Sequence, residues 1–126
     1  MTKAAAIYQF FAGFKLDAYE ENSVYSLENA PDFPYITYQL ETGSFDGNDI
    51  TISASLWYRS TSWGAANAKV EEISAEIGRS GKVIPIDGGF LLVMRGSPFA
   101  QSLGDPSDDM VKRKLLSFVM RFYTND

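Results

Sequence analysis

A strict two-residue alternation of side chains in two stretches constrains the fold of this chain more than any other feature. Between residues 50 and 59, one set of alternating positions is apolar or aromatic: Ile50, Ile52, Ala54, Leu56 and Tyr58. Between residues 111 and 123, a second such set is Leu116, Phe118, Met120 and Phe122. Successive side chains of a β-strand point to opposite faces of its sheet, so each stretch is predicted to be a strand with one face in a core.

Other segments are predicted to extend this sheet. Residues 35–42 also alternate, and turn-forming residues at 43–49 join them to the strand at 50–59, which predicts an antiparallel hairpin. Residues 82–87 and 88–97 are predicted to be two short strands joined by a tight turn, and Pro85 marks the first of them as an edge strand or the site of a bulge. Residues 97–109 are rich in Pro, Gly and Asp and are expected to form a loop before the last strand.

Helical spacing of apolar residues predicts two helices. The first set is Ala4, Ile7, Phe10, Phe11 and Phe14, and the second is Ala66, Val70, Ile73 and Ile77. Thr2 is expected to cap the first helix, which should end near residues 15–19. A Ser or Thr among residues 60–62 is expected to cap the second helix, and Gly78 and Gly81 should end it. Residues 20–33 are predicted to be a surface connection.

The sequence therefore predicts an α+β fold in one domain, residues 1–126, with elements in the order α-β-β-α-β-β-β. The sheet is expected to be mainly antiparallel and flanked by the two helices. Leu115, Val119 and Val93 should place apolar groups on the face opposite the core. Both faces of the sheet are then expected to need cover, as they would in an oligomer.

The composition removes several classes of function. The chain has no Cys and no His, which excludes thiolate nucleophiles, the usual zinc sites and Ser-His-Asp triads. The net charge of −5 and the sequence pI near 4.6 disfavour binding to nucleic acid or anionic lipid. The longest apolar stretch, residues 4–14, is too short to span a bilayer, so we expect a soluble, unprocessed chain. Neither a cofactor nor a metal ion is expected.

The most enzyme-like feature is the string GDPSDDM, which places Asp105, Asp108 and Asp109 within five positions. Carboxylates bind Ca²⁺ or Mg²⁺, but the string lacks the spacing and the central Gly of a calcium-binding loop. The favoured interpretation is that these residues form a turn. A small carboxylate enzyme that uses a divalent ion remains an alternative, as does a monomeric ligand-binding domain with an aromatic pocket.

The string LWYRSTSW gathers aromatic residues where a strand is predicted to meet a helix. Trp57 and Arg59 fall on the outward face of the strand, whereas Trp63 is expected to pack beneath the helix. Base stacking would need a surrounding basic groove, which the sequence does not indicate. Trp, Tyr and Arg are enriched at hot spots of protein interfaces. Trp57 and Arg59 are therefore predicted to anchor a neighbouring subunit.

Four strings carry a resemblance to a known group of proteins: FPYITYQLETGSF, ISASLWYRSTSW, IPIDGGFLLVMRGSPFAQ and DPSDDMVKRKLLSFVMRFYT. Over roughly residues 34–124, the chain resembles tail-terminator or tail-completion proteins, which join head to tail in long-tailed phages and prophages of Gram-positive bacteria. The strings do not separate a terminator from another connector or minor tail protein.

The resemblance implies a non-enzymatic virion protein with an α/β fold. It implies a ring, commonly of six subunits, that caps the tail tube at the head-tail junction after assembly in the host cytoplasm. The implied partners are further copies of the chain, the tail-tube protein and a head-completion protein, without a membrane, and DNA passes through the ring without specific binding. Candidate subunit contacts are Trp57, Arg59, Trp63, Arg95, Phe99, Asp105 and Asp108.

Overall fold

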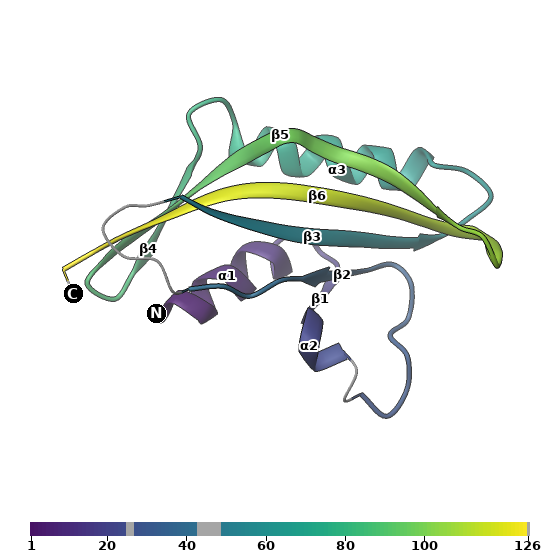
Figure 1. The fold of residues 1–126 in the computed structure, drawn as a ribbon, viewed down its shortest axis with the longest axis horizontal. Coiled ribbons are helices and arrows are strands. Elements are labelled where there is room, and N and C mark those ends of the chain that lie inside the picture. Colours follow the sequence, from purple (N-terminus) through teal and green to yellow (C-terminus); the bar gives the residue numbers. More distant parts are fainter. Residues whose placement is uncertain (25–26, 43–48, 126) are drawn as a thin grey trace.

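The computed structural model of this protein describes residues 1–24, 27–42 and 49–125. The elements within these residues are α1 (Lys3–Ala12), β1 (Asp17–Glu20), α2 (Glu21–Val24), β2 (Tyr35–Tyr38), β3 (Ile50–Arg59), α3 (Gly64–Ile77), β4 (Lys82–Ile86), β5 (Gly89–Asp105) and β6 (Asp108–Thr124). The strands form one sheet in the order β1-β2-β3-β6-β5-β4. The helix α1 packs against both edge strands, β1 and β4, because the sheet curls around it (Figure 1).

The α+β class is as predicted, but the predicted order of elements and the mainly antiparallel sheet are corrected. Residues 17–24, predicted in part as a connection, form β1 and α2. The strand β1 pairs with β2 in parallel, whereas every other ladder is antiparallel, so the sheet is mixed. A strand of four residues is too short to show an alternating pattern. The carboxylate of Glu20 then accepts a hydrogen bond from the Ser23 backbone nitrogen at 3.1 Å, which starts the single turn of α2.

The predicted loop at residues 97–109 is wrong, because β5 and β6 form one long hairpin with its turn at residues 106–107. The pairing shifts register between Arg95, opposite Phe118, and Ala100, opposite Leu116. Residues 96–99 therefore bulge out of the ladder. A β-carbon on Gly96 would lie 2.5 Å from the Ser117 hydroxyl, so this close approach requires glycine. The Gly-Ser-Pro string of the bulge hid the continuation of the strand.

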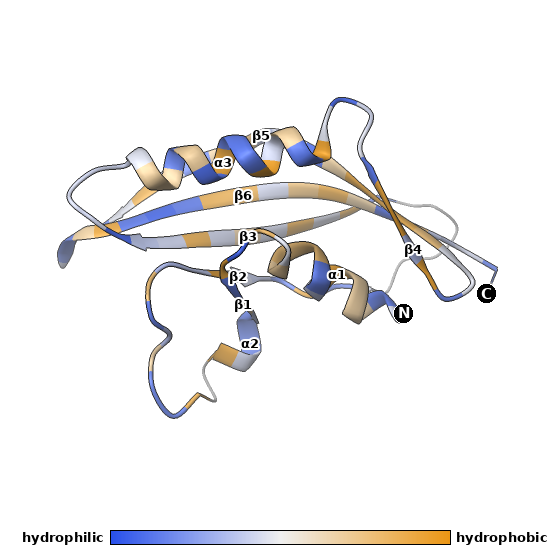
Figure 2. Cartoon of the chain, turned by 180° about the vertical axis from the view of Figure 1, so that it is seen from behind, coloured by the Kyte–Doolittle hydropathy of each residue, from blue (hydrophilic) through white to orange (hydrophobic). Residues whose placement is uncertain are grey.

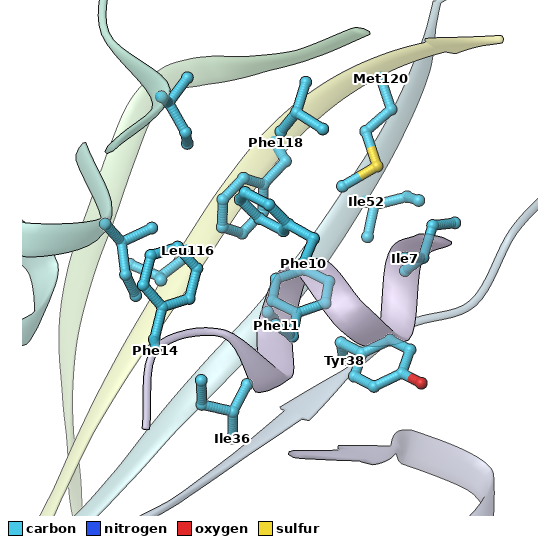
Figure 3. Close-up of a cluster of buried hydrophobic side chains, with 14 of the residues drawn as sticks. Ile7, Phe10, Phe11, Phe14, Ile36, Tyr38, Ile52, Leu116, Phe118 and Met120 are labelled. Carbon is cyan, nitrogen blue, oxygen red and sulfur yellow. The ribbon is translucent and has the colours of Figure 1, made fainter. Parts of the chain in front are cut away.

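The helices α1 and α3 pack on the same face of the sheet, which we call the core face (Figure 2). Both alternating sets predicted to face the core are buried there. The ring of Phe118 lies edge-on to Phe10 and Phe11 at centroid distances of 5.8 and 5.3 Å, and Figure 3 shows this aromatic centre. Val93 is fully buried on the core face, so its predicted position on the opposite face is wrong.

The predicted caps and ends of the two helices are confirmed in part. The Thr2 hydroxyl caps α1 by accepting a hydrogen bond from the Ala5 nitrogen at 3.1 Å, but α1 ends at Ala12, before the predicted range. Trp63 occupies the N-cap of α3 and its side chain makes no cap, but the Ser62 hydroxyl accepts a hydrogen bond from the Gly64 nitrogen at 3.3 Å, so the predicted Ser or Thr cap is confirmed in part. Gly78 ends α3 with φ 71°, as predicted. The predicted turn at 43–49 lies largely outside the described residues, and β4 is an edge strand as expected.

Candidate interaction surface

The face of the sheet turned away from α1 and α3 is the most conspicuous surface of the chain, and we call it the open face. Apolar side chains of β4, β5 and β6 form a strip on it, and register places them on the same side: Val83, Phe90, Leu92, Met94, Val119 and Tyr123. Val83 is 57% exposed and Phe90 is 38% exposed, whereas the others are half-buried. The prediction that Leu115 and Val119 face away from the core is confirmed.

Trp57 lies on the open face, as predicted, and is enclosed by side chains of its own chain. Its ring stacks on Tyr35 of β2 at 6.0 Å between centroids, and the guanidinium carbon of Arg113 on β6 lies 4.7 Å from the ring centroid. The indole nitrogen donates a hydrogen bond to the Thr37 hydroxyl at 2.9 Å. Register places Tyr35, Trp57 and Arg113 directly opposite one another on adjacent strands. Trp57 therefore already has partners within one chain.

Arg59, Asp105 and Asp108 gather near the turn of the β5–β6 hairpin. The Arg59 guanidinium forms an ion pair with Asp108 at 3.2 Å. Asp105 accepts hydrogen bonds from the backbone nitrogen and the hydroxyl of Ser107 at 2.9 and 2.8 Å. These bonds from Ser107 hold the pKa of Asp105 below its usual value. The three side chains therefore organise a hairpin tip, as the turn interpretation expects.

Trp63 lies beside α3 and packs partly against the core. The ammonium groups of Lys112 and Lys114 lie 5.8 and 5.1 Å from its ring centroid. Lys114 is 9% exposed and donates a hydrogen bond to the Ser102 hydroxyl at 2.6 Å. Cation-π contacts of this kind lower the cost of burying a lysine. Lys112 and Lys114 thus fix Trp63 to the β5–β6 hairpin.

The last two candidate subunit contacts, Arg95 and Phe99, also lie apart from Trp57. Arg95 donates a hydrogen bond to the Ser74 hydroxyl of α3 at 2.9 Å. Phe99, in the bulge of β5, packs edge-on against Phe118 at 5.5 Å. The seven candidates are thus divided between the open face, the hairpin tip and the core side of the sheet. They do not form one site.

Sequence reasoning missed a groove between α1, α3 and β4 with a volume of about 350 Å³. Its floor includes Phe10, Phe14 and Ile84, and its rim carries an ion pair between Glu76 and Lys82. Lys69 of α3 donates a hydrogen bond to the Phe14 carbonyl oxygen at 2.8 Å. Neither Trp57 nor Trp63 lines this groove. Three elements far apart in the sequence build it, which is why no local pattern indicated it.

The electrostatics of the described residues offer little for acid-base chemistry. Burial is the main cause that raises the pKa of Tyr35, Tyr38 and Tyr58, so their hydroxyls stay neutral near pH 7. Within residues 1–24, 27–42 and 49–125, no group of three or more Asp or Glu side chains is arranged to hold a metal ion.

None of the helices in this described part has the length and apolar character needed to cross a membrane.

Comparisons with known proteins give no assignment. No protein-family model matches the chain, and neither a curated protein nor a solved structure matches it significantly.

Proposed function

We propose that this chain is a non-enzymatic structural subunit of a phage or prophage tail. Copies of it form a ring of six subunits at the head-proximal end of the tail tube. The ring ends growth of the tube and joins the tail to the head. Its partners are other copies of the chain, the tail-tube protein and a head-completion protein.

The observation that carries this proposal is the open face. The core face is covered by α1 and α3, but the opposite face presents an apolar strip in which Val83 and Phe90 are exposed. Large exposed apolar patches on a soluble protein mark interaction sites. If neighbouring copies cover the open face in the ring, its apolar residues need no cover from their own chain.

The sequence strings point to a phage tail, because they resemble tail-terminator and tail-completion proteins, although they do not separate a terminator from another connector. The overall charge is compatible with this role. A ring of subunits that each carry a net charge of −5 repels the DNA that passes through it, and like charge prevents the duplex from sticking to the wall.

The first test measures the mass of the purified protein by light scattering over a range of concentrations, with negative-stain imaging of large species. Closed rings are the expected result. A strict monomer is then incubated with purified tail tubes, because assembly can need the tube end as a template. Absence of rings in solution together with absence of binding to tube ends would overturn the proposal.

A second test separates a terminator from a connector of the same tail. Gold-labelled protein is added to tubes that lack heads, and the labelled end is identified by imaging. A terminator binds one end of each tube and prevents further addition of tube protein. Binding along the tube, or to heads alone, would contradict the terminator assignment.

A further inference from the structure

The charges of this chain are divided unevenly along the sequence. Residues 16–58 contain eight Asp and Glu and no Lys or Arg, a charge of −8. The remaining residues contain eight Asp and Glu and 11 Lys and Arg, a charge of +3, and the sum of −8 and +3 is the net −5. One contiguous segment is therefore strongly acidic, although the rest of the chain is mildly basic.

Most carboxylates of the described part of this acidic segment are in none of the ion pairs found between described residues. Among ion pairs between described residues, the segment contributes only Asp49, which binds Arg121. Between β1 and β2, residues 27–30 and 32–34 are exposed and include apolar groups. Leu27 is 40% exposed and Phe33 is 39% exposed, and the carboxylates of Glu28 and Asp32 are exposed near them in the sequence.

The open face has the complementary character. Its strands carry Arg59, Arg113 and Arg121, of which Arg59 and Arg121 already form ion pairs with Asp108 and Asp49, and its apolar strip is uncovered. Arg113 donates to the Ser55 hydroxyl at 3.0 Å and stacks on Trp57, but no described carboxylate pairs with it. A guanidinium that is already fixed in position loses little side-chain entropy when it binds a carboxylate.

The part of the acidic segment at residues 27–34 does not cover the apolar strip of its own chain. Figure 1 shows α2 and residues 27–34 projecting from the edge formed by β1 and β2, away from β4 and β5. The strip lies on β4, β5 and β6, toward the opposite edge of the sheet. Residues 27–34 and the apolar strip therefore lie toward opposite edges of the sheet.

We propose that the acidic segment around residues 27–32 of one copy docks on the open face of a second copy. Glu28 or Asp32 pairs with Arg113 there, and Leu27 packs against apolar groups of the open face. This inference rests on the proposed function and adds which surfaces meet. The contact is heterologous, because it joins two different surfaces, and such contacts close into rings when the rotation between copies permits.

The alternative pairing of two open faces is disfavoured by charge. It would bring the Arg113 residues of two copies toward the same interface and leave the acidic segment without a partner. Like charges placed together at an interface oppose association. The contact between the acidic segment of one copy and the open face of the next copy instead places opposite charges together at every interface of a ring.

The test is a charge exchange between two variants. Arg113→Glu makes the open face repel the acidic segment, and Glu28→Lys with Asp32→Lys makes the segment repel the open face. Each variant alone should self-associate at least about tenfold more weakly than the unchanged chain, measured by light scattering. When the two variants are mixed in equal amounts, every interface of an alternating ring again joins opposite charges, so assembly should return.

The control is Arg79→Glu, which makes the same charge change at an exposed residue in the connection between α3 and β4. It should assemble as the unchanged chain does. Circular dichroism checks that each variant is folded, and recovery in the mixture is a second check, because an unfolded variant cannot be rescued. If the unchanged chain assembles only on tail tubes, the same comparison is made by counting occupied tube ends.

The outcomes separate the two proposals. Rings that form equally well from both charge variants would overturn the docking inference and leave the proposed function standing. Weak assembly of both variants without recovery in the mixture would also overturn it. If the unchanged chain assembles neither in solution nor on tubes, both proposals fail.

Discussion

The two faces of the sheet differ in how their side chains find partners, although the same strands supply both. On the core face, Phe118 is fully buried among aromatic rings from α1 and from the β5 bulge. On the open face, the neighbouring Val119 is only half-buried, and side chains stack only on their neighbours across the strands, as Trp57 does on Tyr35 and Phe90 does on Tyr123. The core face therefore stabilises the monomer, and the open face leaves surface available to a neighbour.

The largest expected effect comes from substituting one residue on each face. Phe118→Ala removes a buried ring and should lower the free energy of unfolding by about 3–5 kcal/mol. Val119→Ala, one position along the same strand, should lower it by less than about 1 kcal/mol because its side chain is only half-buried. Urea denaturation followed by circular dichroism measures both. Equal losses would break the distinction between the faces.

The second effect tests whether Trp57 serves the monomer as well as an interface. Trp57→Ala removes the stack on Tyr35, the contact with Arg113 and the hydrogen bond to Thr37. It should cost about 2 kcal/mol of unfolding free energy, with the monomer still folded. Trp57→Phe keeps an aromatic ring and should cost about half as much. Loss of assembly without any loss of monomer stability would show that the intramolecular stack contributes little.

A smaller effect is expected at the bulge of β5. Gly96→Ala places a methyl group 2.5 Å from the Ser117 hydroxyl and 2.8 Å from its carbonyl oxygen. The clash should destabilise the fold by about 1–2 kcal/mol. Gly104→Ala is the matched control in the same strand, because a β-carbon there meets no atom within 4 Å. Thermal unfolding of the two variants compares them, and similar midpoints would mean that the bulge adjusts at little cost.

The alternating strands could be predicted because burial on one face leaves a two-residue period in the sequence. That period placed Leu56 and Phe118 in the core and Trp57 and Val119 on the other face, as the structure has them. It assigned Val93 to the wrong face. The strand β1 and the helix α2 were missed because each has four residues, fewer than a pattern needs. The long hairpin of β5 and β6 was missed because the Gly-Ser-Pro string of its bulge is also typical of a loop.

The surroundings of the candidate residues were less predictable than the strands. The stack of Tyr35, Trp57 and Arg113 depends on strand order and register, which a single sequence does not reveal. The division of charge could have been read from the sequence directly, since no Lys or Arg occurs between Lys15 and Arg59. The structure adds that Arg59, Arg113 and Arg121 lie on the open face.

The smallest effect concerns the hairpin tip, which belongs to neither face. Hydrogen bonds from Ser107 lower the pKa of Asp105 in the folded chain. A carboxyl group whose folded pKa is depressed adds stability above its unfolded pKa of about 3.9, and loses that contribution as the pH falls through the lower folded value. Asp105→Asn should therefore reduce stability slightly at pH 7, and its difference from the unchanged chain should shrink as the pH falls below about 4. Denaturation midpoints at pH 7, 5 and 3 measure this difference. Because the tip is exposed, the effect should stay small at every pH, and a large effect at pH 7 would mean that the tip supports one of the faces after all.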